Sequence, residues 1–247
     1  IKKYNREYAG YEIEKIASCL YQSIDDQQIK VKLEVIKFNS VLNAYGFFSI
    51  KRGSGIFEAE NINEFYSNSI SLIQIGEYVI YSQTEQVDSL LQKDLKTFVN
   101  IPLIYISQNY LQDKLPDSLR VLKGKDGYGV LYSHKPNDRF PFVANINCTQ
   151  WSWSNDLIDV FFNENESFYD AYEIFKKTID NNYIMISSDN TYTAYKKEKD
   201  NRYSFISITD KWVFGCWSVK NLNDGKKVLS EILSRIQYYK KKEVLRK

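Results

Sequence analysis

The chain has 247 residues, with 33 basic and 31 acidic side chains and a formal net charge of +2. Because the charges nearly balance, no global field attracts nucleic acid or an acidic partner, and we expect no nucleic-acid binding. The length allows one large domain or two modest ones. No apolar run approaches the ~20 residues that a membrane-spanning helix needs, so we expect no transmembrane span.

Cysteine usage excludes a Cys-x-x-Cys metal or redox pair, because Cys19, Cys148 and Cys216 lie far apart in the sequence. We expect buried free thiols, and a bridge between Cys148 and Cys216 stays open as an alternative. Because the chain begins at Ile1, we expect a leader or a larger N-terminal piece to be missing, and any lipid anchor with it.

The first two predicted elements lie in residues 11–22 and 28–38. Residues 11–22 fit either a short helix or a strand. Residues 28–38 alternate, with apolar positions such as Leu33 on one side and with Lys32 and Glu34 on the other. This alternation predicts a half-buried strand whose two charged side chains face solvent.

A helix and a hairpin follow this strand. Asn39-Ser40 is a typical helix start, and we expect the helix to give way near Phe47 to another apolar run. Residues 69–81 are rich in β-branched and aromatic side chains around Gly76-Glu77. That composition predicts a hairpin with its turn at these two residues.

The first half ends in a helix over residues 86–99, and we expect Pro102 to terminate it. Residues 103–116 then form a linker. The second half shows further hairpin and strand signals, followed by an amphipathic helix. They are a turn at Asp126-Gly127, an extended run over 139–153, short strands at 184–186 and 192–195, and a hairpin over 203–216 around Asp210-Lys211.

A long-period repeat relates the two halves. Residues 33–50 resemble residues 157–176, with Glu34-Val35 matching Asp159-Val160 and with two more residues between strand and helix in the second copy. The hairpins also match, as do the helical stripes Leu91, Leu95, Val99 and Val228, Ile232, Ile236.

The predicted fold is therefore α+β, with two related halves at residues 1–102 and 117–247 joined by the linker 103–116. We expect each half to have an antiparallel sheet covered by helices. The halves would pack as one unit about a pseudo-twofold axis, and a cleft between them would be the default binding site.

Three short motifs resemble an uncharacterised bacterial family. They are residues 44–49 (AYGFFS), residues 76–79 (GEYV) and Leu115-Pro116, which opens the second half. Members of that family are usually secreted or lipid-anchored, so the resemblance implies a location outside the cytoplasm, in the periplasm or cell envelope. The family's N-terminal tyrosine-isoleucine-asparagine-glycine-glycine segment is not found in this sequence, and the family has no established activity.

Two groups of residues are candidates for a site. Tryptophan on a strand face can stack on a sugar or anchor a partner, and Trp151, Trp153, Trp217 and Tyr128 are the candidate ligand-binding aromatics. Paired carboxylates can perform acid–base chemistry or hold calcium. The candidate acidic cluster is Asp156, Asp159, Glu164, Glu166 and Asp170, with the two glutamates in the loop before a helix.

Other groups favour ordinary structural roles. His134 is the only histidine, which excludes a multi-histidine metal site within one chain, and it reads as an exposed loop residue. The glycine-rich runs 51–55 and 123–129 lack the spacing of a phosphate-binding loop and read as turns. We expect no cofactor, no metal site and no catalytic residue.

The function that the sequence favours is non-enzymatic binding outside the cytoplasm, with a small molecule, a glycan or a protein as the unknown partner. A hydrolase of glycans or peptides that uses the carboxylates from Asp156 to Asp170 is one alternative, and it requires two carboxyl groups facing one cleft. A structural subunit of a cell-envelope assembly is another.

Overall fold

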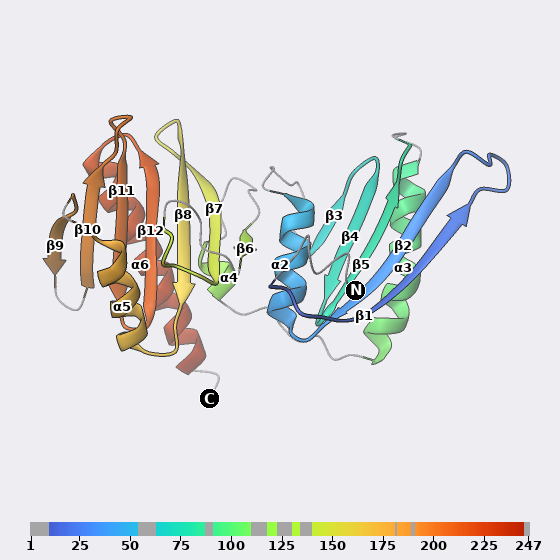
Figure 1. Ribbon diagram of the computed structural model, residues 1–247, viewed down its shortest axis with the longest axis horizontal. Helices are drawn as coiled ribbons and strands as arrows, with labels where there is room; N and C mark the ends of the chain where they lie inside the picture. Colours follow the sequence, from blue (N-terminus) through green and yellow to red (C-terminus); the bar gives the residue numbers. More distant parts are fainter. Residues whose placement is uncertain are drawn as a thin grey trace. The chain divides into compact units, whose positions relative to one another are not determined.

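The computed structural model describes residues 10–53, 63–86, 91–109, 118–122, 130–133, 140–180, 182–188 and 191–244. The chain divides into two compact units, Ile1–Leu115 and Pro116–Lys247 (Figure 1). Each unit is an antiparallel sheet packed with helices, as the sequence predicted for each half. In the described residues, no helix is long and apolar enough to cross a membrane.

The first unit has a five-stranded antiparallel sheet with the order β1-β2-β5-β4-β3. Helix α2 follows β2, and helix α3 follows β5 (Figure 1). The elements are β1 (Ile13–Gln22), β2 (Lys30–Phe38), α2 (Val41–Arg52), β3 (Glu64–Tyr66), β4 (Ile70–Ile75), β5 (Tyr78–Thr84) and α3 (Leu91–Asn109).

Helices α2 and α3 cover opposite faces of this sheet (Figure 1). On one face, the ring of Phe38 on β2 packs against Phe47 of α2 with 5.2 Å between centroids. On the other face, Leu33 and Ile80 form a cluster with Val99 of α3. Because side chains alternate across a strand, the sheet is buried from both sides, and both helices are needed to form the core.

The second unit has a seven-stranded antiparallel sheet with the order β6-β7-β8-β12-β11-β10-β9. Its helices again lie on both faces (Figure 1). The elements are α4 (Ser118–Val121), β6 (Leu131–Ser133), β7 (Ile146–Trp153), β8 (Asp156–Glu164), α5 (Phe168–Thr178), β9 (Ile184–Ser188), β10 (Thr191–Lys197), β11 (Tyr203–Thr209), β12 (Trp212–Val219) and α6 (Leu222–Val244).

Separate clusters form on the two faces of the second sheet. Ala171 of α5 packs with Phe161 and Val213, whose side chains point to one face. Phe205 points to the other face and lies directly beside Gly225 of α6. The predicted stripe Val228, Ile232 and Ile236 is buried, as are Leu95 and Val99 in the first unit.

The two units share one arrangement of elements. Strands β7-β8-β12-β11-β10 have the same neighbours and directions as β1-β2-β5-β4-β3, and β6 and β9 extend the second sheet at its edges. In both units the strand β2 or β8 leads into a helix on one face, a hairpin follows, and the last helix covers the other face.

The structure aligns the residues of the two units differently from the sequence-based prediction. The first residue after the hairpin turn lies opposite Lys37 in the first unit and opposite Glu164 in the second. The helix N-caps Ser40 and Ser167 follow three positions later in both units, and each serine oxygen accepts from a backbone N–H of the first turn. The two extra residues predicted between strand and helix are therefore absent, and Glu164 is the last residue of β8 rather than part of a loop.

Several local predictions are corrected or resolved. Residues 13–22 form a strand, and α2 continues through Phe47 to Arg52 without an intervening apolar strand. Pro102 lies inside α3, so residues 103–109 of the predicted linker are helical. The two hairpins at Gly76-Glu77 and Asp210-Lys211 are confirmed, as are the short strands β9 and β10. The predicted turn at Asp126-Gly127 lies outside the described residues.

Gly225→Ala tests the packing of α6 against its sheet. Alanine is a better helix former than glycine by about 1 kcal/mol. However, a Cβ at this position would lie 2.1 Å from Cε2 of Phe205. We expect the overpacking to dominate and to lower the free energy of unfolding by about 1–3 kcal/mol.

Urea unfolding followed by tryptophan fluorescence measures this effect, because all four tryptophans lie in the second unit. The same substitution in a Phe205→Leu background is the control and is expected to cost less. A higher urea midpoint for Gly225→Ala alone would contradict the packing.

Candidate functional site

The site in the first unit arises because α2 covers only part of the sheet face on which it packs. The nine residues of β2 extend about 30 Å at ~3.3 Å per residue. The twelve residues of α2 extend about 18 Å at ~1.5 Å per residue. Because α2 starts beside the end of β2 at Phe38 and packs on β5 and β4 as well as on β2, the Lys30 end of the strand lies beyond the helix.

A groove of about 340 Å³ lies at this end of the sheet. Its walls come from β1, from β2 with the loop before it, and from the end of β5 with the residues that follow. Only one wall residue has an aliphatic side chain, and the others are polar or charged. The lining residues are Leu20, Gln28, Lys30, Lys32, Gln83, Thr84, Glu85 and Gln86.

Cross-strand pairing explains why these side chains meet. Lys32 on β2 lies between Leu20 on β1 and Gln83 on β5, so the three side chains form one row on the same sheet face. The next row toward α2 places Glu34 beside Tyr81. The groove therefore lies over the first row, and the second row separates it from the apolar residues under α2.

Glu34 is the unusual residue of this region, because only 2% of it is exposed. Its Oε1 lies 2.7 Å from Nζ of Lys32, whose side chain remains 45% exposed. A buried carboxylate is costly without a partner, and this ion pair supplies one. The sequence had placed Glu34 on the solvent side of its strand. It does share a face with Lys32, but α2 and Tyr81 cover the face at that point.

The wall carries charged groups and side-chain amides. Lys30 is exposed and makes no ion pair with any described residue. Side-chain amides of Gln28, Gln83 and Gln86 add donors and acceptors. The ionisable groups of the wall are Lys30, Lys32 and Glu85.

The corresponding region of the second unit is filled by aromatic rings. In the register that aligns Lys37 with Glu164, Glu34 corresponds to Phe161, and Gln83 corresponds to Trp217. Phe140 packs on both of these rings, with centroids 4.3 Å from Phe161 and 5.5 Å from Trp217. In the same register Lys32 corresponds to Asp159, which accepts from the Gln150 amide. The second unit therefore covers this sheet face with aromatic rings beside one polar pair, whereas the first unit keeps a groove there.

The three described members of the predicted aromatic site, Trp151, Trp153 and Trp217, have different surroundings. Trp151 is buried, donates its indole N–H to the carbonyl of Leu122 at 2.8 Å, and stacks on the Arg235 guanidinium. Trp217 is half-buried in the aromatic cluster around Phe140. Trp153 is half-buried at the end of β7 and Tyr128 lies outside the described residues. The buried and hydrogen-bonded indole of Trp151 supports a structural role for that residue. Trp153 is more accessible to solvent than Trp151.

The predicted acidic cluster is dispersed along β8 and α5. Asp156 and Glu164 lie at opposite ends of the strand, about 26 Å apart by ~3.3 Å per residue. Asp159 points to the sheet face opposite that of Asp156 and Glu164, and its carboxylate accepts a hydrogen bond from the Gln150 amide at 3.0 Å. Asp170 accepts from the Ser167 hydroxyl at the start of α5. This placement gives the hydrolase alternative no support.

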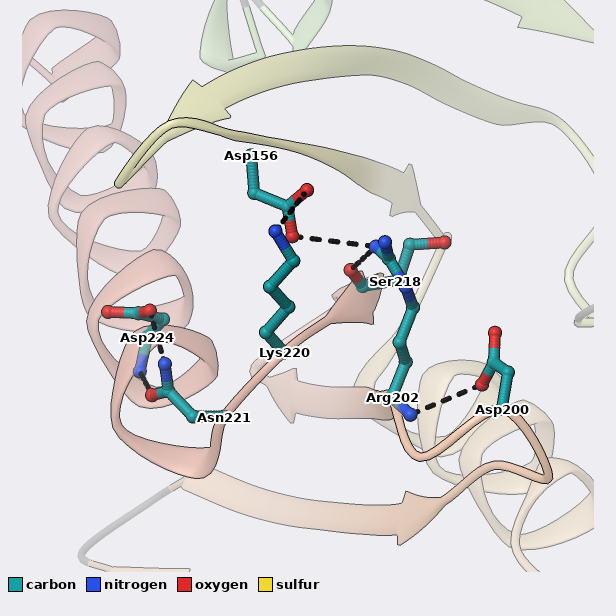
Figure 2. Close-up of polar contacts among 7 residues, drawn as sticks. All are labelled: Asp156, Asp200, Arg202, Ser218, Lys220, Asn221 and Asp224. Atoms are coloured by element: carbon teal, nitrogen blue, oxygen red, sulfur yellow. Dashed lines mark hydrogen bonds and ion pairs between the residues drawn. The ribbon is translucent and has the colours of Figure 1, made fainter.

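Asp156 belongs instead to an ion-pair network at the end of the second sheet (Figure 2). Its carboxylate lies 3.2 Å from Lys220 Nζ and 3.5 Å from a terminal guanidinium nitrogen of Arg202. The same guanidinium nitrogen donates to the Ser218 carbonyl at 2.7 Å. Trp153 lies directly opposite Asp156 across the β7–β8 hairpin, so these two candidates do meet. The network joins three loops and is satisfied internally.

Glu164 and Glu166 have ordinary surroundings. Glu164 forms an ion pair with Lys211 at 2.6 Å, and Glu166 is exposed in the turn before α5. No group of three or more histidine, cysteine, aspartate or glutamate side chains that could hold a metal occurs in the described parts of the chain. His134 and the glycine-rich run 123–129 lie outside those parts.

The cysteines are free thiols, and Cys19 is exposed rather than buried as predicted. Cys148 lies opposite Phe161 and Cys216 lies opposite Val160, so the two point to opposite faces of the sheet. A bridge between them is therefore excluded. Burial raises the pKa of Cys148 to about 11 and raises that of Cys216 further, so both are poor nucleophiles.

No protein-family model matches this chain, and the searches of curated proteins and of solved structures also find no match. The resemblance to the uncharacterised bacterial family stays a prediction.

Two substitutions test the ion pair beside the groove. Lys32→Met removes the cation at 2.7 Å from a buried carboxylate, so we expect the free energy of unfolding to fall by about 1–3 kcal/mol. Glu34→Gln removes the buried charge itself and should cost less. Lys30→Met is the matched control, with an expected change within about 0.5 kcal/mol.

Urea unfolding followed by far-ultraviolet circular dichroism is the measurement, because tryptophan fluorescence reports only the second unit. Equal losses for Lys32→Met and Lys30→Met would show that the carboxylate does not depend on Lys32.

Proposed function

We propose that this is a non-enzymatic binding protein whose first unit holds a small polar molecule in the groove beyond α2. The observation that carries the proposal is the open groove of about 340 Å³, which lies beside the position where the second unit packs Phe140 on Phe161 and Trp217. Its volume falls in the range of small-ligand pockets, roughly 300–1,000 Å³.

The lining favours a ligand with an anionic group and several hydrogen-bonding groups. Lys30 is the cation that has no ion-pair partner among the described residues, so it is available to a carboxylate or phosphate. Lys32 also lines the groove, and its ammonium group is paired with Glu34 at 2.7 Å. Gln28, Gln83 and Gln86 supply amides for the rest of the ligand.

A duplication accounts for the two related units. The shared order of elements, the shared strand neighbours and the equivalent serine N-caps support it. In this view the ancestral unit had a partly covered sheet face. The second copy closed that face with Phe140, Phe161 and Trp217, whereas the first copy kept it polar.

The location outside the cytoplasm is also part of the proposal. Its support is the resemblance carried by residues 44–49, 76–79 and 115–116. Fractionation of cells that produce the full-length protein tests it, and recovery in the cytoplasmic fraction would contradict it.

Thermal unfolding against small anions tests the groove. The panel contains inorganic phosphate, citrate, glutamate and glucose 6-phosphate. A ligand at a hundred times its Kd stabilises the folded state by about 2.7 kcal/mol, which raises the midpoint by several degrees. We expect at least one of these to do so, and we expect Lys30→Gln to reduce the increase by more than half.

Lys177→Gln is the matched control, since Lys177 is an exposed lysine on α5 in the second unit. Each variant is compared with its own ligand-free midpoint. A flat panel, or a shift that Lys30→Gln and Lys177→Gln leave equally intact, would contradict the proposed groove.

A further inference from the structure

Three exposed aromatic rings form a small platform on the second unit. Phe168 and Tyr172 come from α5, and Tyr192 comes from β10. Each ring contacts the other two, with centroid distances of 5.9 Å for Phe168–Tyr172, 6.4 Å for Phe168–Tyr192 and 6.0 Å for Tyr172–Tyr192. We call these three residues the aromatic platform.

Local structure explains why the rings gather there. The Ser167 cap fixes the start of α5, and residues four apart then lie on one side of the helix. Ala171 and Phe175 of the same helix point into the core, so Phe168 and Tyr172 lie along its flank. Tyr192 pairs with Ile208, a residue of the core cluster that α5 covers, which places Tyr192 on the same sheet face as the helix.

The exposed area of the platform fits a small ligand better than a protein. The three residues are 44%, 37% and 40% exposed. With roughly 200 Å² for a whole aromatic residue, they expose about 240 Å² together. A stable protein interface needs about 800 Å² on each partner, whereas one or two sugar rings match the smaller area.

The polar groups of the platform also suit a sugar. The hydroxyls of Tyr172 and Tyr192 make no hydrogen bond with any residue that the structure describes, and their recorded contacts are those between rings. A pyranose ring offers C–H groups on its faces and hydroxyls at its edge. It can therefore pack on the rings and hydrogen-bond the two phenol groups at once. The platform itself carries no charge, which favours a neutral sugar.

We propose that the aromatic platform is a carbohydrate-binding site that takes one or two neutral pyranose units of a glycan. It is a second site, independent of the groove in the first unit, since its residues all belong to the second unit. Of the tryptophans that the sequence suggested for sugar stacking, Trp151 is buried and Trp153 and Trp217 are half-buried, whereas Phe168, Tyr172 and Tyr192 are all exposed.

Isothermal titration with maltohexaose, cellohexaose, xylohexaose and chitohexaose tests the proposal on the full chain. We expect at least one of these to bind, and Tyr192→Ala to weaken that binding at least tenfold. Tyr172→Phe keeps the ring and removes one hydroxyl, so we expect a loss of about two- to fivefold.

Tyr169→Ala is the matched control, because Tyr169 is 69% exposed on the same helix turn but does not pack against the rings of the aromatic platform. It should leave the affinity unchanged within twofold, as should Lys30→Gln in the groove. Unchanged urea midpoints establish that the variants are folded. Absence of binding by all four oligosaccharides, or equal losses for Tyr192→Ala and Tyr169→Ala, would overturn the proposal while leaving the groove untested by that result.

Discussion

The arrangement of both units depends on one mismatch of lengths. A strand gains about 3.3 Å per residue and a helix about 1.5 Å, so α2 after β2 and α5 after β8 each cover only part of the sheet face on which they pack. Each unit must complete that face in another way. The second unit does so with Phe140 over Phe161 and Trp217, and the first leaves a polar groove above Lys32.

The side chains next to the open face follow from this difference. In the second unit, Gly215 gives Phe161 the space for its ring, since a Cβ there would lie 2.5 Å from the ring. In the first unit the corresponding strand position is Tyr81, which fills the space from the other strand, and Glu34 lies where Phe161 would be. The larger side chain of each pair therefore lies on β8 in the second unit and on β5 in the first. As a result, the β2 position next to the groove carries the carboxylate of Glu34.

Much of the fold could be predicted because its signals are local. Turns at Gly76-Glu77 and Asp210-Lys211 carry their own backbone preferences, and the stripe Val228, Ile232, Ile236 repeats at helical spacing. The groove could not be predicted in this way. Alternation places Glu34 on a face with Lys32, but only the course of α2 decides where that face becomes buried. Pro102 likewise lies inside a helix, because tertiary packing outweighs its cost there.

Solvent paramagnetic relaxation with a neutral gadolinium chelate, read by nuclear magnetic resonance, compares the two sheet faces in one sample and needs no ligand. If the groove is open, the chelate strongly broadens the side-chain amide protons of Gln83. It then has little effect on the ring protons of Phe140 and Phe161, which are fully buried. Protection of the Gln83 amide equal to that of the two rings would show that the first face is closed as well and would contradict the open groove.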